Sequence, residues 1–388
     1  MSRLQLAFSA LLFCLTAATQ AAQVIIPAPP ELAAKAWVLM DADSGEVLVE
    51  YNADQQLPPA SLTKIMTTFI VSEEIMEGRL KEQDLVRVSD NAWRKGGSAS
   101  GSSTMFLKPR SEVSVIDMLR GVIIQSGNDA SIALAEHISG SEEAFADVMN
   151  QVAQLLGMQN TNFENATGWP AEGHLTTARD LAILARATIN DHPDHYAIYA
   201  EKYYKHNGIN QPNRNKLLFR NKFVDGLKTG HTKEAGYCLV ASEKRNDMRL
   251  ISVVLGTKST EARATESQKL LAYGFRYYET HKLYSKGQLV PELQQRVWGG
   301  EQESLDMMIA SDVVATIPRG SREQLSLESE VDSVLKAPIS KGQELGVLSL
   351  QLDGKTVVEA PLLAANDVAE AGFFARMWDE LMLMFEDE

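Results

Sequence analysis

The chain has 388 residues, of which 45% are apolar and 23% are charged, and its net charge is −14. This composition is typical of a folded protein of two or three domains and excludes a mainly disordered chain. The acidic balance disfavours nucleic acid as a partner, because a general nucleic-acid binder needs a basic face. Beyond the N-terminal segment no apolar run reaches the roughly 20 residues that span a bilayer, which excludes a polytopic membrane protein.

Residues 1–21 have the pattern of a secretory signal peptide. Arg3 precedes an apolar run from Leu4 to Leu15, and small residues follow up to Ala22. This pattern predicts cleavage near residue 21 or 22; a short buried helix is the alternative. After cleavage Cys238 would be the only cysteine, so no intramolecular disulfide is expected. An acidic, exported chain without disulfides is typical of the bacterial periplasm or cell envelope.

Residues 22–280 are expected to form an α/β (α+β) domain with an antiparallel sheet. Asp43-Ser44-Gly45 separates two short apolar runs, which predicts a hairpin. Apolar spacing predicts helices over 61–77, 115–124, 130–138, 143–156 and 177–189. Strands are expected over 236–241 and 250–255, joined by a charged turn over 243–249. The Gly- and Ser-rich segment 91–106 is expected to be a loop, either over the site or on a plain surface.

Residues 281–368 lose the helical periodicity. Strands are expected over 313–317, 325–331 and 345–352, and Asp353-Gly354 predicts a further hairpin. We interpret this part as a smaller all-β domain that serves as a spacer or as a docking module.

Residues 369–388 predict an amphipathic helix after a flexible linker over 360–370. Its aromatic and aliphatic side chains recur at helical spacing, while Arg376 is its only basic residue and Glu386-Asp387-Glu388 ends it. This helix is expected either to lie on a membrane surface or to pack on the β domain.

Three motifs carry chemistry. Ser61-Leu62-Thr63-Lys64 opens a predicted helix, so its serine hydroxyl and lysine amine lie on one face, where a neutral lysine can activate the serine. Ser126-Gly127-Asn128 sits in a tight turn between two predicted helices. Lys228-Thr229-Gly230 begins a strand whose glycine permits close approach of another segment. Each motif alone is common; an N-cap serine with a solvated lysine is the ordinary reading of the first.

Together, in this order, the motifs resemble those of the penicillin-binding proteins and serine β-lactamases. Further segments narrow the resemblance to the D-alanyl-D-alanine carboxypeptidases, the low-molecular-mass penicillin-binding proteins of the 5 and 6 type. They are Pro59-Ala60 before the first motif, Asn213-Arg214-Asn215, Asp225-Gly226-Leu227 before the third motif, and Tyr273-Gly274-Phe275-Arg276. The resemblance covers nearly all of the mature chain.

The resemblance implies a role for each motif residue. Ser61 is the expected nucleophile, Lys64 its base, and Ser126 the relay of a proton to the leaving group. Asn128 is expected to orient the substrate, and Lys228 and Thr229 to hold its carboxylate in a cationic site. Gly230 and His231 continue that strand, and the amides of Ser61 and His231 are the expected oxyanion donors. Arg263 is either a second carboxylate contact or a solvated arginine at a helix start.

The resemblance further implies removal of the terminal D-alanine from the pentapeptide stems of peptidoglycan, in cell-wall remodelling and shape control. β-Lactams are the expected covalent inhibitors, and neither a cofactor nor a metal is expected. The expected location is the periplasmic side of the inner membrane, with the C-terminal helix on its surface. Two alternatives stay open: a wall-binding scaffold with little turnover, and a serine β-lactamase. The segment 160–166 lacks the spaced Glu and Asn that a class A β-lactamase uses, and Ala166-Thr167-Gly168-Trp169 departs from the usual histidine-glycine pair, so fine substrate preference stays open.

Overall fold

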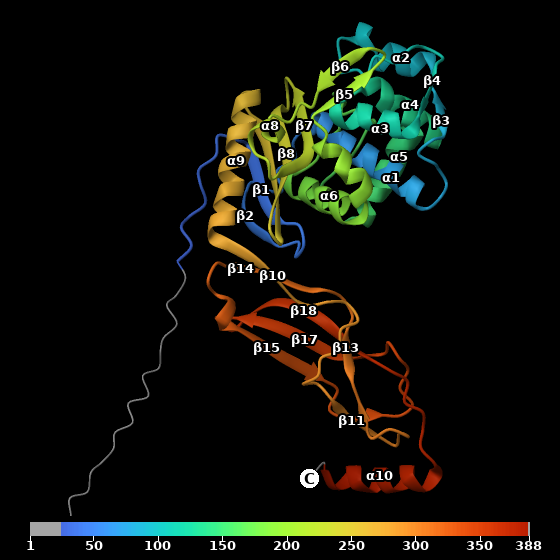
Figure 1. The fold of residues 1–388 in the computed structure, drawn as a ribbon, viewed down its shortest axis with the longest axis vertical. Helices are drawn as coiled ribbons and strands as arrows, with labels where there is room; N and C mark the ends of the chain where they lie inside the picture. Colours follow the sequence, from blue (N-terminus) through green and yellow to red (C-terminus); the bar gives the residue numbers. More distant parts are fainter. Residues whose placement is uncertain (1–24, 387–388) are drawn as a thin grey trace, which may run out of the picture.

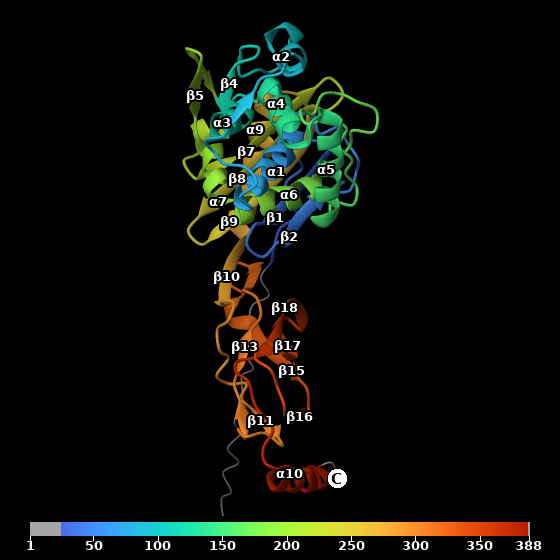
Figure 2. The same ribbon diagram turned by 90° about the vertical axis from the view of Figure 1, so that its right-hand side faces the viewer.

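A computed structural model describes residues 25–386, so the predicted signal peptide over 1–21 lies outside the described residues. A mixed helix-and-sheet body holds the N-terminal two thirds of the chain, and an elongated β body follows it (Figures 1 and 2). A single helix lies crosswise at the far end of the β body.

The larger body is built on an antiparallel sheet in the order β2-β1-β9-β8-β7. Successive side chains of a strand point to opposite faces of a sheet. In β1, Trp37 and Leu39 therefore pack into one apolar core, while Val38 and Met40 pack into another. The strands are β1 (Ala36–Asp41), β2 (Val47–Tyr51), β7 (Val224–Thr232), β8 (Gly236–Arg245) and β9 (Met248–Thr257).

Helices cover both faces of this sheet. The long helix α9 (Thr260–Tyr277) packs on one face, and the helical layer packs on the other. Ser114, Ser141 and Thr177 cap three of these helices by accepting hydrogen bonds from backbone N–H groups. The layer contains α1 (Lys64–Met76), α2 (Asp90–Gly96), α3 (Val115–Ile124), α4 (Asn128–Ser139), α5 (Glu142–Leu155), α6 (Ala178–Asp191) and α7 (Pro193–Tyr196). The short helix α8 (Leu217–Arg220) lies on the other face, where Leu217 and Leu218 pack into the same core as α9.

Short pieces complete the larger body. Two small antiparallel sheets pair β3 (Leu85–Arg87) with β4 (Glu112–Ser114), and β5 (Tyr203–His206) with β6 (Ile209–Pro212). The 3-10 turns are η1 (Ala60–Thr63), η2 (Ser98–Ser100) and η3 (Ala197–Ala200). The predicted α/β (α+β) class with an antiparallel sheet is confirmed.

Three local predictions for this body were wrong. Ser61 does not open the α-helix but lies in η1, after Ala60 with a positive φ of 50°. The charged stretch 243–249 is mostly strand, since Lys244 pairs with Arg249 and the turn holds only Asn246 and Asp247. Charged side chains alternate there with buried ones, which a strand with one solvated face permits. The segment 91–106 is not one loop, since it contains most of α2 and all of η2, but its residues Gly101, Ser102 and Ser103 line the active-site cavity, as one alternative expected.

The β body begins within β10 (Tyr278–Tyr284), which follows α9 directly and pairs with β14 (Val313–Pro318). Its largest sheet has the order β13-β18-β17-β15, and the predicted hairpin at Asp353-Gly354 joins β17 to β18. The remaining bounds are β11 (Gln295–Trp298), β12 (Ser304–Leu305), β13 (Met307–Ile309), η4 (Arg322–Gln324), β15 (Leu325–Val331), β16 (Leu335–Lys336), β17 (Glu344–Leu352) and β18 (Lys355–Ala364).

The predicted flexible linker over 360–370 is wrong. Residues 360–364 belong to β18, which pairs with β17 and β13. Val368 bridges to Ile339, and Glu370 bridges to Gly300. Backbone pairing therefore continues almost to the start of the terminal helix.

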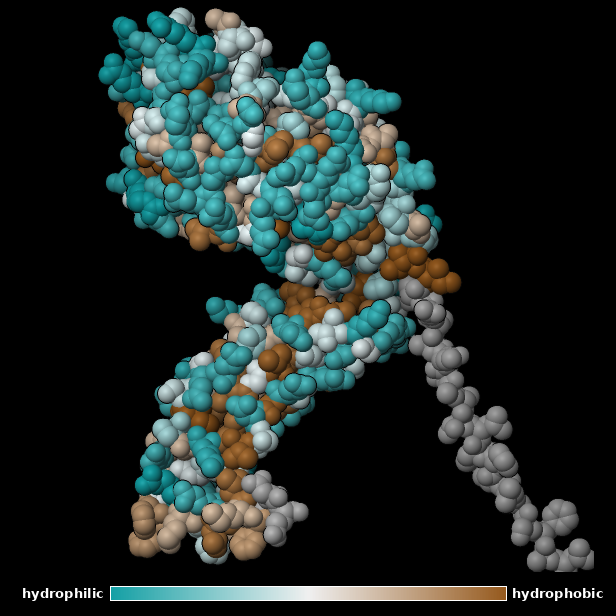
Figure 3. Space-filling model, turned by 180° about the vertical axis from the view of Figure 1, so that it is seen from behind, coloured by the Kyte–Doolittle hydropathy of each residue, from teal (hydrophilic) through white to brown (hydrophobic). Residues whose placement is uncertain are grey.

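The terminal helix α10 (Phe373–Glu386) is attached to the β body by its polar edge. The carboxylate of Asp379 accepts a 2.8 Å hydrogen bond from the backbone N–H of Gly299. The large apolar side chains point away from the body, with Phe374 79% exposed and Trp378 63% exposed, and they form apolar surface at that end (Figure 3). The apolar face is Phe373, Phe374, Met377, Trp378, Leu381, Met382, Met384 and Phe385. Within residues 25–386, no helix has the length and apolar content that crossing a membrane requires.

Candidate active site

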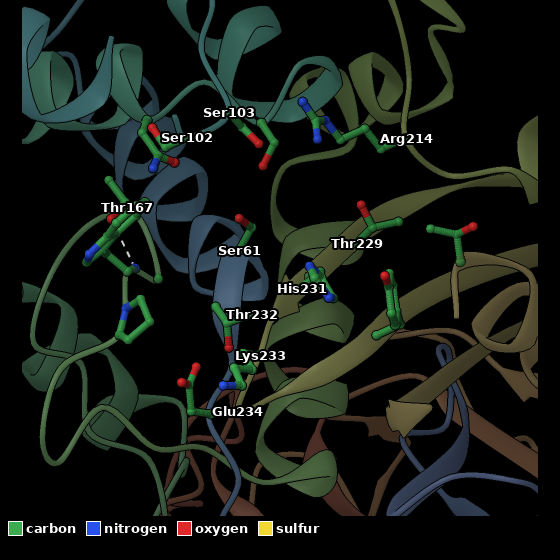
Figure 4. A pocket seen from close by; sticks show the side chains of 18 of the residues that line it. Ser61, Ser102, Ser103, Thr167, Arg214, Thr229, His231, Thr232, Lys233 and Glu234 are labelled. Carbon is green, nitrogen blue, oxygen red and sulfur yellow. Dashed lines mark hydrogen bonds between the residues drawn. The ribbon is translucent and has the colours of Figure 1, made fainter. Parts of the chain in front are cut away.

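The three motifs meet at one cavity of about 470 Å³ on the larger body. Ser61 faces this cavity, with Thr167 on one side and Arg214, Thr229 and His231 on the other (Figure 4). Segments 65 and 102 residues apart in the sequence thus contribute to one site. Of the predicted site residues, the lining contains Ser61, Ser126, Asn128, Thr229, Gly230, His231 and Arg263.

The first motif forms a pair of interacting side chains. Lys64 is the first residue of α1 and is fully buried, and its Nζ lies 3.1 Å from the Oγ of Ser61. The Nζ also donates a hydrogen bond to the carbonyl oxygen of Thr167. The solvated lysine of the ordinary reading is therefore absent from this position.

Burial, together with the positive charge of Arg214, lowers the pKa of Lys64 to about 7. Desolvation disfavours the ammonium form, as does a nearby cation. A substantial fraction of Lys64 is therefore a neutral amine near neutral pH, and a neutral amine can take the proton of Ser61.

The second motif lies between α3 and α4. Ser126 adopts a positive φ of 61°, and its Oγ accepts a 2.9 Å hydrogen bond from the Nζ of Lys228. Asn128 is buried, its backbone N–H donates to the carbonyl of Ser103, and its side-chain oxygen Oδ1 has no hydrogen-bond partner. Asn128 lines the cavity, so its side chain lies beside the space that a ligand would occupy.

The third motif lies on the edge strand β7. A Cβ on Gly230 would come within 2.9 Å of the carbonyl oxygen of Pro59, so glycine permits β7 to approach the turn that holds Ser61. Lys228 is buried, and this burial, with the charges of Lys64, Arg214 and Arg263, lowers its pKa well below the usual value.

Sequence reasoning expected Lys228 to keep the site cationic and to lower the pKa of Lys64. The repulsion between Lys64 and Lys228 is present and contributes to the lowered pKa of Lys228, while Arg214 is the cation that lowers the pKa of Lys64.

Arg263 is buried in α9, so the expectation of a solvated arginine was wrong. Its Nη1 donates to the carbonyl of Gly230 at 3.0 Å and to that of Cys238 at 3.4 Å. Burial lowers its pKa to about 10, which leaves the guanidinium charged at neutral pH. Arg263 thus supports β7 and β8 from behind and adds positive charge to the cavity.

Arg214 was missed as part of the site, and the turn 165–169 was linked to substrate preference without a role for its residues. Asn213-Arg214-Asn215 was singled out as a motif, but no role was assigned to its arginine. Both asparagines fix this segment: Asn213 donates to the carbonyls of Tyr199 and Glu201, and Asn215 donates to that of Gly226. An asparagine on each side of Arg214, able to donate to backbone carbonyls, was the signal in the sequence that the structure fixes this arginine in place.

The turn 165–169 forms one wall of the cavity. The Oδ1 of Asn165 accepts hydrogen bonds from the backbone N–H groups of Thr167, Gly168 and Trp169. Gly168 has a φ of +79°, and a Cβ there would lie 1.8 Å from the carbonyl oxygen of Ala60. This glycine therefore permits contact between the turn and the turn of Ser61.

Comparisons with known proteins agree with this geometry. A family model described as D-alanyl-D-alanine carboxypeptidase matches residues 23–259, and one for the penicillin-binding protein 5 C-terminal domain matches residues 278–370. The D-alanyl-D-alanine carboxypeptidase DacC of Escherichia coli is 46% identical over 380 residues, which cover 97% of this chain and 94% of that protein.

Solved structures give the same result. The crystal structure of penicillin-binding protein 5 from Haemophilus influenzae matches with a TM-score of 0.83 and 43% identity, over 89% of this chain and all of that one. Penicillin-binding protein D2 from Listeria monocytogenes, solved in an ampicillin-bound form, matches 64% of this chain with a TM-score of 0.56 and 31% identity.

The fold and the site define a penicillin-binding serine peptidase. The chain belongs to the D-alanyl-D-alanine carboxypeptidase family and is of the penicillin-binding protein 5 type. The family and the carboxypeptidase activity predicted from the sequence are confirmed, and the scaffold and β-lactamase alternatives are not favoured.

Proposed function

We propose that Ser61 is the nucleophile that removes the terminal D-alanine of a peptidoglycan stem pentapeptide through an acyl-enzyme. The observation that carries this proposal is the 3.1 Å approach of Lys64 Nζ to Ser61 Oγ, with the amine fully buried and its pKa lowered to about 7. The neutral amine takes the hydroxyl proton as Oγ bonds to the carbonyl carbon between the two D-alanines. A serine beside such a base is the usual arrangement of an activated nucleophile.

Breakage of the amide bond releases D-alanine. The proton that Lys64 took reaches the leaving nitrogen through Ser126, which gives its own proton and receives that one in exchange. The backbone N–H groups of Ser61 and His231 stabilise the oxyanion. Water then attacks the ester, and Ser61 regains its proton as the shortened stem leaves. β-Lactams acylate the same Oγ and block it.

The substrate is held by groups around the nucleophile. Thr229, with Lys228 beneath it, and the charges of Arg263 and Arg214 bind the terminal carboxylate. Asn128, which lines the cavity, orients the stem.

The test is the variant Ser61→Ala. Fluorescent penicillin labelling and D-alanine release from a stem pentapeptide should both vanish, while the melting temperature stays within a few degrees. Labelling that persists in the variant would exclude Ser61 as the nucleophile. Labelling of the wild type without D-alanine release would favour a scaffold.

We propose domain limits that follow the sequence reasoning: a signal peptide over 1–21, a catalytic domain over 22–280, a β domain over 281–368 and a membrane-binding helix over 369–388. The two apolar cores of the larger body are formed by residues up to Tyr278, and the apolar cores of the β body begin at Leu283. This supports the main division between the two domains. Limited proteolysis followed by mass spectrometry checks it.

The protein is further proposed to act at the periplasmic face of the inner membrane, with α10 lying on the lipid surface. The exposed apolar face of α10 supports this location, since each large side chain buried in lipid contributes roughly 1.5–3 kcal/mol. Acidic residues close the sequence, so binding to anionic lipid should strengthen with salt.

Flotation with vesicles of inner-membrane lipid tests the anchor. The double variant Phe374→Ser/Trp378→Ser and a truncation after Glu370 should both lose binding and keep penicillin acylation. The control Ala375→Ser, at an exposed position of the same helix, should bind like the wild type. Equal flotation of all four forms would mean that α10 is no anchor.

A further inference from the structure

A surface rich in positive charge begins at the rim of the active-site cavity. The segment 202–224, which forms β5, β6 and α8, contains six Lys and Arg residues and no Asp or Glu, although the whole chain has a net charge of −14. All six of these residues are exposed. We call this segment the basic surface, and its cations are Lys202, Lys205, Arg214, Lys216, Arg220 and Lys222.

Much of this charge is not neutralised within the protein. Two acidic side chains beside the segment already have partners, since Glu201 pairs with Arg120 at 3.1 Å and Glu261 pairs with Arg220 at 2.6 Å. Concentrated positive charge on an otherwise acidic protein attracts an anionic partner and determines where it binds. The cations that form no ion pair within residues 25–386 include Lys202, Lys205 and Lys222.

Exposed aromatic rings lie among these cations. Tyr203 on β5 is 57% exposed and Phe219 on α8 is 42% exposed, and their ring centroids are 5.6 Å apart, edge to face. The Nζ of Lys202 lies 5.8 Å from the centroid of the Phe219 ring. Phe223 is 43% exposed, and the Nζ of Lys222 lies 5.0 Å from its centroid. Exposed rings beside cations favour a partner with both flat apolar faces and negative charge.

The position of the basic surface points to the substrate polymer as that partner. Arg214 lines the active-site cavity, and the Nζ of Lys216 donates a 3.1 Å hydrogen bond to the Oγ1 of Thr260, which also lines it. The β5–β6 hairpin lies at the opposite end of the molecule from α10, with the β body between them (Figures 1 and 2). A lipid surface bound by α10 is therefore far from the basic surface, whereas a polymer that enters the cavity passes beside it.

We propose that the basic surface is an accessory binding site for the peptidoglycan polymer whose stem occupies the active site. Its lysines bind the free carboxylates of neighbouring stems, while Tyr203 and Phe219 stack on sugar rings of the glycan strand. The site therefore favours stems that belong to polymerised wall over a short soluble peptide with the same end. The proposal rests on the proposed function, because it takes a peptidoglycan stem to be the substrate.

Cosedimentation with purified, lipid-free peptidoglycan tests the binding. Lys202→Glu/Lys222→Glu should weaken binding about tenfold, since two exposed charge contacts together account for about that factor. Tyr203→Ser/Phe219→Ser should also weaken it, because the stacking area is lost. Wild-type binding should fall as salt rises from about 50 mM to about 500 mM, since salt screens exposed charges.

Matched controls separate this surface from general effects of charge and hydrophobicity. Lys81→Glu/Lys355→Glu makes the same change in net charge at exposed positions outside the segment and should bind like the wild type. Leu155→Ser removes a side chain that is 86% exposed on α5 and should also bind like the wild type. Melting temperatures of all variants check that each one is folded.

Release of D-alanine gives the second readout. Both basic-surface variants should release it about tenfold more slowly from pentapeptide-containing peptidoglycan, in line with their weaker binding. Their kcat/KM for a soluble N-acetylated tripeptide that ends in D-Ala-D-Ala should equal that of the wild type, because so short a substrate does not reach the surface.

Wild-type binding by both variants would overturn the accessory site, as would equal losses on the polymer and on the soluble peptide. Loss of binding to anionic lipid vesicles with unchanged binding to peptidoglycan would also overturn it and would identify a membrane as the partner. None of these results affects the proposed function, because the soluble peptide would still be cleaved. Absence of D-alanine release from the soluble peptide by the wild type would refute the proposed function instead.

Discussion

Arg214 provides a sharp test of how Lys64 becomes a neutral base. Lys64 is neutral enough to act because its pKa falls from 10.5 to about 7, with burial as the main cause and Arg214 as the second. The full shift corresponds to roughly 5 kcal/mol against the ammonium form. Replacing Arg214 by Gln removes the second cause and leaves the first.

The expected size follows from the position of Arg214. Its guanidinium lines the cavity and is open to solvent, so its interaction with Lys64 is screened to about 1 kcal/mol, or about one pKa unit. Activity needs the neutral amine, so it is present above the pKa of Lys64 and lost as the pH falls through it. In Arg214→Gln this acid limb should move from about pH 7 to about pH 8.

The assay is the second-order rate of penicillin acylation between pH 5.5 and pH 9.5, followed by stopped-flow fluorescence. The variant should react about tenfold more slowly than the wild type at pH 6 and should recover most of that loss at pH 9.5. Arg214→Lys keeps the charge and should keep the acid limb near pH 7. A loss in Arg214→Gln that is the same at every pH would refute the electrostatic role and leave Arg214 as a binding group only.

Three further predictions concern single positions. Lys64→Met replaces a buried amine with an apolar side chain of similar shape, so D-alanine release should vanish. The melting temperature in calorimetry should stay equal or rise, and a large loss of stability would contradict this. Gly168→Ala should destabilise by more than about 3 kcal/mol in urea unfolding, because its Cβ would overlap the carbonyl of Ala60. Gly140→Ala shares the positive φ but meets open space and should cost only about 1 kcal/mol, so equal losses would refute the overlap. Asp129→Asn should cost about 2–4 kcal/mol and slow acylation, since this buried carboxylate accepts hydrogen bonds from Thr104, Met105 and Leu107 near the second motif; unchanged stability would argue against that role.

Local patterns in the sequence were enough for most of the elements. The helices at 115–124 and 177–189 and the hairpins at 43–45 and 353–354 could be predicted because their signals are local: apolar spacing, a capping residue, or a turn dipeptide. The family could be predicted because Ser61, Ser126 and Lys228 belong to short motifs whose order is visible in the chain.

The features that only the tertiary structure decided depend on contacts between segments far apart in the sequence. The pKa of Lys64 depends on full burial and on Arg214, which lies 150 positions later in the chain. The linker expected over 360–370 proved to be paired strand, because the partners of β18 come from β13 and β17, and Pro361 is compatible with that ladder. A sequence window contains neither the burial of an amine nor the partner of a strand, since both arise only when distant segments pack together. The residue types of the catalytic pair were therefore determined by the sequence alone, while the protonation of that pair and the attachment of α10 were decided by packing.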